Sequence, residues 1–158
     1  MKYIGVSLLV LAGIASSGCS VFKDKYAVKE NHFRFENYKK DSFDQIERAF
    51  LTCQDHKPTK KFEPRIFEVG QHNLWVTATV SKDSLKNQTK EAFVNFDVTL
   101  ESGKSYELDG NVIGNKISLW IKDSSTDEAV SEVITTNLER PSVDNYKKRL
   151  EWCKSGTV

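Results

Sequence analysis

Few side chains in this sequence are suited to chemistry, and the most suggestive group is the run Cys53-Gln54-Asp55-His56. A thiolate beside an imidazole is what a zinc site or a covalent cysteine mechanism would use. The sequence has no C-x-x-C pair and no second cluster of Cys and His to complete a zinc site. The histidines His32, His56 and His72 stand among polar neighbours, and we expect them at the surface. We therefore predict no metal, no cofactor and no catalytic residue.

Known catalytic motifs are also missing from the sequence. It contains no G-x-S-x-G nucleophile elbow, no P-loop, no G-x-G-x-x-G and no H-E-x-x-H. A Ser-His-Asp site stays open at this point, because such triads are defined in space rather than by chain order. The chain carries 23 Lys and Arg against 22 Asp and Glu, so it has no long-range field that would gather polyanions. We predict that the protein is not an enzyme and that it does not bind nucleic acid.

The first eighteen residues have the pattern of an export signal. Lys2 is followed by an apolar run from Ile4 to Ile14, and then by small residues up to Gly18. A membrane-spanning helix needs about 20 largely apolar residues, so this run is too short to span a bilayer. A charged start, a short apolar run and a small-residue cleavage region are typical of a signal peptide. We predict that residues 1–18 are removed on export.

The small residues Ser17 and Gly18 lie directly before Cys19, and this arrangement resembles the lipobox of bacterial lipoproteins. Position 16 is Ser, where that family most often has Leu. Ordinary signal cleavage after Ala15-Ser16-Ser17 is the alternative. In the lipoprotein family the thiol is diacylated, the chain is cut before the cysteine, and the new amino group is usually acylated as well. The resemblance implies a palmitate-type anchor at Cys19 and, because Ser20 is not Asp, an outer-membrane location facing the periplasm.

The remaining cysteines form an even pair once Cys19 is acylated. An exported protein with an odd number of cysteines carries a reactive thiol, so the count of three favours lipidation of one. The periplasm is oxidising, and disulfides form and persist there. We predict a disulfide between Cys53 and Cys153.

Two segments carry an apolar stripe at helical period, and each contains one of these cysteines. In both, apolar residues recur at offsets 0, 3, 7 and 10 behind a serine able to cap a helix. The first stripe, behind Ser42 with Gln45 three residues on, is Phe43, Ile46, Phe50 and Cys53; the second, behind Ser142, is Val143, Tyr146, Leu150 and Cys153. We predict helices over about 41–53 and 142–155.

Between these segments the period changes from 3.6 to 2. Apolar and polar residues alternate over 74–80 and 92–100. Further alternating runs follow near 106–112, 117–121 and 129–135, and residues 66–69 are a candidate for an additional strand before them. Tight turns such as Gly114-Asn115 join them, which favours an antiparallel meander. We predict an α+β fold: a sheet of about five to six antiparallel strands with both helices packed on one face and linked by the disulfide.

The mature chain has the size of one domain. We predict a signal peptide at 1–18, a lipidated N-terminus and tether at 19–40, and a single periplasmic domain at 41–158. Within the tether range, residues 32–38 alternate weakly and are a candidate for a short edge strand. Trp75 with Thr77, and Trp120 with Lys122, stand opposite the aliphatic rows of their strands. Aromatic area exposed among polar residues is typical of partner surfaces. The alternative is that the sheet curls, so that both of its faces are partly buried.

These residues lead to a functional hypothesis. We expect a membrane-anchored envelope lipoprotein with a non-catalytic domain that binds a protein partner through the face carrying Trp75 and Trp120. The alternative is a carrier of an apolar or lipid-like ligand, held in a cavity between sheet and helices. A hydrolase is the least favoured class, since no motif supports it.

Overall fold

The computed structural model of the protein describes residues 28–59, 65–82 and 88–156, and the described part is mainly β-structure. The elements in chain order are β1 (His32–Glu36), β2 (Tyr38–Asp41), β3 (Gln45–Gln54), β4 (Lys57–Pro58), β5 (Arg65–Glu68), β6 (Gly70–Lys82), β7 (Lys90–Leu100), β8 (Ser105–Ile113), β9 (Lys116–Asp123), β10 (Ile134–Asn137) and α1 (Val143–Ser155).

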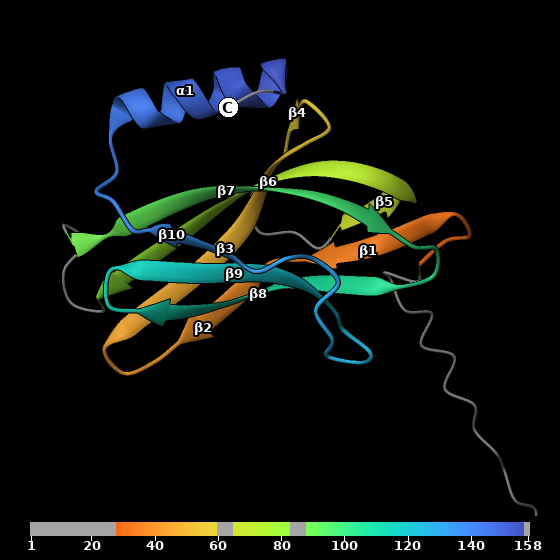
Figure 1. The fold of residues 1–158 in the computed structure, drawn as a ribbon, viewed down its shortest axis with the longest axis horizontal. Helices are drawn as coiled ribbons and strands as arrows, with labels where there is room; N and C mark the ends of the chain where they lie inside the picture. The colour runs from red at the N-terminus through yellow and green to blue at the C-terminus, as the bar shows by residue number, and fades with distance from the viewer. Residues whose placement is uncertain (1–27, 60–64, 83–87, 157–158) are drawn as a thin grey trace, which may run out of the picture.

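The strands form two sheets that pack face to face (Figure 1). Sheet A has the strand order β10-β9-β8-β1-β5, and sheet B has the order β2-β3-β6-β7, with β4 paired to β3. The pairs are antiparallel except for β1 and β8, which run parallel with Phe35 opposite Tyr106. Along the longer strands about one residue in two points inward, and these side chains form a single core between the sheets, including Phe33, Leu74, Val76, Phe96, Leu108 and Leu119.

The predicted α+β fold is therefore wrong. The alternation over 74–80 and 92–100 does mark strands, and these belong to β6 and β7. Their apolar face is covered by a second sheet rather than by two helices. The parallel pair β1 and β8 also departs from the predicted simple meander, because β1 enters sheet A between strands that are distant in sequence.

The predicted helix over 41–53 is wrong, because these residues form a hairpin of β2 and β3. Ser42 does contact Gln45, but its Oγ donates to the Gln45 carbonyl oxygen at 2.8 Å and closes the turn instead of capping a helix. The same segment also carries a period-2 pattern, with Ala49 and Leu51 pointing into the core. Pairing of β3 with β6 along its length decides between the two periods, because tertiary contacts override local propensity.

The C-terminal helix was predicted correctly. Ser142 accepts a hydrogen bond from the Asn145 backbone N–H at 3.1 Å, and the helix ends at Gly156, whose φ of 70° is the left-handed conformation that favours glycine. Glu139 and Glu91 exchange two backbone hydrogen bonds, of 2.7 and 2.8 Å, which tie the segment before α1 to the start of β7. This tie directs α1 across the outer face of sheet B (Figure 1).

The folded domain begins before the predicted boundary at residue 41. β1 and all of β2 except Asp41 lie within the range 19–40 that was predicted to be a tether, and both are built into the sheets. β1 lies at the candidate strand of 32–38. The predicted signal peptide and Cys19 lie outside the described residues. In the part of the chain that the structure describes, no helix has the length and apolar character needed to cross a membrane.

Candidate functional site

The structure does not bring the four residues of the predicted binding surface together. Trp75 and Thr77 lie on β6 in sheet B, whereas Trp120 and Lys122 lie on β9 in sheet A. Trp75 is only 3% exposed, while Trp120 is half-buried. The two tryptophans therefore belong to different sheets and do not form one exposed face.

Trp75 is buried because α1 lies over it. Its ring stacks on Phe93 of β7 with centroids 5.0 Å apart, and Trp152 of α1 lies 6.5 Å from Trp75 and 6.0 Å from Phe93. The outward face of sheet B thus provides an aromatic platform on which the helix rests. An indole read from the sequence as a partner contact serves instead to hold the helix on the sheet.

Lys122 is surrounded by acids. Its Nζ lies 2.6 Å from Asp127, 2.9 Å from Glu107 and 3.2 Å from Asp109. Hydrogen bonds to Asp127 and Glu107 raise the pKa of Lys122 well above its ordinary value, so it stays charged. Because three carboxylates share this charge, Lys122 links β9 to its neighbours and does not present a free cation.

The predicted disulfide is confirmed: Cys53 and Cys153 are bonded, with their Cα atoms 5.7 Å apart. The geometry depends on an irregularity in β3. Leu51 pairs with Val76 but Cys53 pairs with Trp75, so β3 has one residue more than β6 at this point. This bulge changes the alternation, so that Leu51 faces the core while Cys53 faces outward to α1.

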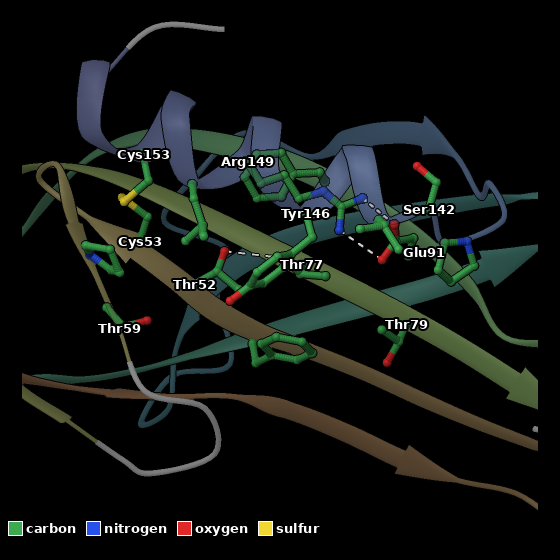
Figure 2. Close-up of a pocket in the computed structure, with 16 residues that line it drawn as sticks. Thr52, Cys53, Thr59, Thr77, Thr79, Glu91, Ser142, Tyr146, Arg149 and Cys153 are labelled. Atoms are coloured by element: carbon green, nitrogen blue, oxygen red, sulfur yellow. Dashed lines mark hydrogen bonds and ion pairs between the residues drawn. A yellow bond between two sulfur atoms is a disulfide. The ribbon is translucent and has the colours of Figure 1, made fainter.

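An apolar pocket of about 540 Å³ lies between α1 and the outer face of sheet B (Figure 2). Phe50 and Phe93 belong to its sheet side, and the disulfide lines it as well. Val143, Tyr146 and Leu150 line it from the helix. Its volume falls within the range of sites that bind small molecules.

The helix stripe is buried only at one end, and this explains why the pocket is open. Cys153 is 2% exposed and Leu150 is half-buried, but Tyr146 is 61% and Val143 is 75% exposed. The disulfide holds the C-terminal half of α1 on the sheet, whereas the inner side of the N-terminal half faces the open pocket. The sequence predicts an apolar stripe along the helix. It does not predict that the N-terminal half of this stripe is left uncovered by the other described residues.

The charged side chains of the pocket neutralise each other. Arg149 donates two hydrogen bonds to Glu91, of 2.9 and 2.8 Å (Figure 2). Its guanidinium also lies 5.0 Å from the centre of the Phe93 ring. Both side chains are largely buried, so this ion pair is better shielded from water than a surface pair. These two are the only charged residues among the described ones that line the pocket. The site therefore favours a ligand without net charge.

Threonines on the sheet side have their hydroxyl protons directed into the protein. Thr52 donates to the Trp75 carbonyl oxygen at 2.9 Å, Thr77 donates to Thr52 at 3.4 Å, and Thr59 donates to the Leu51 carbonyl at 2.5 Å. Because these donors are engaged, the three threonines offer a ligand their methyl groups and oxygen lone pairs. Of the predicted surface residues, Thr77 alone lines this pocket.

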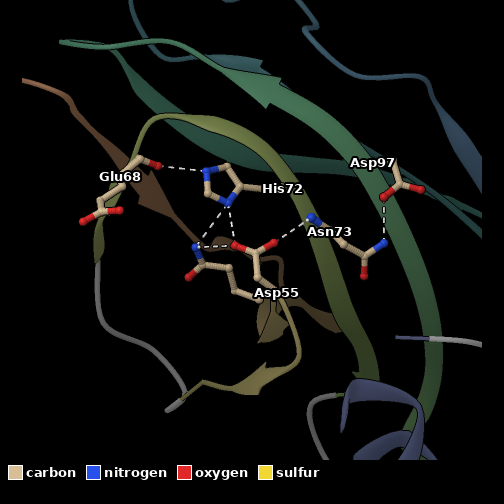
Figure 3. Close-up of polar contacts among 6 residues, drawn as sticks. Asp55, Glu68, His72, Asn73 and Asp97 are labelled. Atoms are coloured by element: carbon tan, nitrogen blue, oxygen red, sulfur yellow. Dashed lines mark hydrogen bonds and ion pairs between the residues drawn. The ribbon is translucent and has the colours of Figure 1, made fainter. Parts of the chain in front are cut away.

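His72 and Asp55 form the closest approach to a catalytic pair (Figure 3). His72 was expected at the surface but is buried on β6, with Nδ1 2.7 Å from an Asp55 carboxylate oxygen and Nε2 2.8 Å from the Glu68 carbonyl oxygen. In a catalytic triad the second ring nitrogen faces a nucleophile, whereas here it faces a backbone acceptor. The pair therefore serves to fix the turn between β3 and β4 against β6.

Asp55 is held in its ionised form by this network. Its partial burial acts to raise the pKa, but hydrogen bonds from the Asn73 backbone N–H and from His72 outweigh that effect, so the pKa of Asp55 lies below its ordinary value. Asp55 and His56 both have positive φ, of 46° and 67°, as the tight turn after Gln54 requires. The run Cys53-Gln54-Asp55-His56 is thus a disulfide residue followed by an anchored turn.

Among the described residues, no group of His, Cys, Asp and Glu could hold a metal ion.

Comparisons with protein-family models, with curated proteins and with solved structures find no match to this chain.

Proposed function

We propose that the protein is a lipid-anchored envelope lipoprotein whose folded domain is a non-catalytic carrier of an uncharged apolar ligand. The ligand would occupy the pocket between α1 and sheet B. The anchor would be acylated Cys19, with the domain facing the periplasm from the outer membrane. The single observation that supports the carrier function is the apolar pocket of about 540 Å³, whose charged lining residues, Glu91 and Arg149, pair with each other.

The geometry favours the carrier over the protein-partner hypothesis. The latter required Trp75 and Trp120 to share an exposed face, but Trp75 is covered by α1. The carrier hypothesis required a cavity between helix and sheet, and the pocket lies at that place. An apolar ligand would also cover Val143 and Tyr146, and the removal of their apolar area from water would favour binding by roughly 25 cal/mol per Å².

Titration with N-phenyl-1-naphthylamine, an uncharged probe that fluoresces in apolar surroundings, tests the proposal. The wild-type chain should bind the probe saturably. Thr79 lines the pocket and is half-buried, so Thr79→Phe places a ring in the ligand space and should weaken binding at least about tenfold, a change of about 1.4 kcal/mol.

The matched control is Thr135→Phe, which adds the same ring at an exposed position of β10 in sheet A. This variant should bind the probe as the wild type does. Equal probe affinity in the wild type and in Thr79→Phe would place the probe elsewhere and would count against the pocket as the site.

A further inference from the structure

Two hairpin turns carry apolar side chains that contact little else. Phe43, in the turn between β2 and β3, is 99% exposed, and Ile113, at the turn between β8 and β9, is 72% exposed. Single exposed apolar residues are common on protein surfaces. A fully exposed Phe at a hairpin tip, with an exposed Ile on a second tip, is more unusual and indicates a surface that meets an apolar phase.

Both turns lie at the same end of the sandwich (Figure 1). Gln45, two residues after Phe43, is opposite Lys82 in the pairing of β3 with β6. Val112 and Gly114, on either side of Ile113, line one pocket together with Gln45 and Lys82. The two sheets therefore bring their hairpin tips together, although the tips are about 70 residues apart in the chain.

The pocket between the tips is basic. It has a volume of about 340 Å³ and is lined by Lys82, Lys90 and Arg140, with no carboxylate among its described lining residues. Lys90 also hydrogen-bonds the Asn115 side chain, which holds it beside the turn between β8 and β9. Three cations without an acid in the same pocket favour an anionic ligand.

The other charged residues around the two hairpin tips are also mostly basic. Lys40 and Lys116 lie exposed on the two hairpins. Among the described residues around the tips, Asp41 pairs with Lys39 at 2.5 Å, and the remaining acids are Asp44, Glu139 and the buried Glu47, against five cations. The whole chain is nearly neutral, with a formal net charge of +1, so this end concentrates positive charge that the average hides.

We propose that this end of the domain docks on a bilayer containing anionic phospholipid. Phe43 and Ile113 enter the interfacial region, and Lys82, Lys90 and Arg140 bind a lipid phosphate between them. Apolar contact combined with basic residues is how peripheral domains bind anionic membranes. The proposal goes beyond the carrier function, since it uses neither the pocket under α1 nor acylation of Cys19.

Hydrogen exchange of the full chain on vesicles tests the proposal. One sample contains phosphatidylcholine vesicles, and the other contains vesicles with one quarter phosphatidylglycerol. Backbone amides over 41–45 and 111–116 should exchange more slowly only with the anionic vesicles. Because each cation near an anionic surface contributes about fivefold to the binding constant, Lys82→Gln/Arg140→Gln should lower the docking constant about 25-fold.

Two further variants keep the test independent of folding. Phe43→Ser/Ile113→Ser changes only exposed side chains, so it should remove the protection while leaving the domain folded. Lys29→Gln/Lys57→Gln removes two exposed cations elsewhere and should dock as the wild type does. Equal exchange of the tips on both vesicle types would overturn the proposal. So would full protection of the tips by inorganic phosphate alone, which would indicate a site for free anions.

Discussion

Removing the disulfide between Cys53 and Cys153 is expected to lower the free energy of unfolding by about 3–5 kcal/mol. The bond joins residues 100 positions apart, and closing a loop of that length is worth about 4.7 kcal/mol in the chain-entropy model. Domains of this size are typically stable by about 5–15 kcal/mol, so the loss is a large fraction of the total. The Cys53→Ala/Cys153→Ala variant should remain folded at neutral pH but with little reserve.

Urea unfolding followed by tryptophan fluorescence measures this change, because Trp75 and Trp152 report on the contact between α1 and sheet B. In the double variant the fluorescence change should occur at lower urea concentration. If α1 is held mainly by the bond, the fluorescence change should also precede the loss of the far-ultraviolet signal of the sheets.

Cys19→Ala is the matched control, since it replaces the cysteine that lies outside the described residues. Its unfolding midpoint should equal that of the wild type. A double variant within about 1 kcal/mol of the wild type would refute the reasoning, because it would mean that the buried bond does not restrict the unfolded chain in the way its span requires.

Three further outcomes follow from contacts in the structure. Arg149→Ala leaves Glu91 partly buried without its partner and should lower the free energy of unfolding in urea by about 1–3 kcal/mol, whereas Arg149→Ala/Glu91→Ala should recover part of the loss. Asp55 has a lowered pKa in the folded state, so its contribution to stability is present above its unfolded pKa near 3.8 and is lost as the pH falls through the folded value. In thermal melts the stability advantage of the wild type over Asp55→Asn should therefore be constant from pH 7 to about 5 and should vanish on further acidification. Gly110→Ala would place a Cβ 2.8 Å from the Leu119 side chain and should cost about 1–3 kcal/mol, and an unchanged melting temperature would contradict that packing.

Periodicity predicted the strands whose two faces differ in polarity. Leu74, Val76 and Ala78 alternate with more polar residues, and they point into the core as a period of 2 requires. The same rule failed over 41–53, where apolar residues fit both the helical and the strand period. Long-range pairing with β6 decided the outcome there, and a single sequence contains no direct signal of that pairing.

The candidate site was only partly predictable. Cysteine parity led to the correct pair, although one of the two helices thought to carry it is a strand. For Trp75 the sequence left both exposure and burial open. The actual cause of its burial, which is α1 lying over its outward face, was not predicted, because the contact is made across about 77 residues of chain. His72 was misjudged because its partners, Asp55 and the Glu68 carbonyl, are polar groups that make burial of an imidazole possible.

The most direct test of the central claim is a comparison of native and denaturing mass spectra of the chain purified without detergent. If the pocket under α1 carries an uncharged apolar molecule, the native spectrum of the wild type will show an added mass that disappears on denaturation, and Thr79→Phe will lack it. A native wild-type mass equal to the denatured mass, or the same added mass in Thr79→Phe, would contradict the claim.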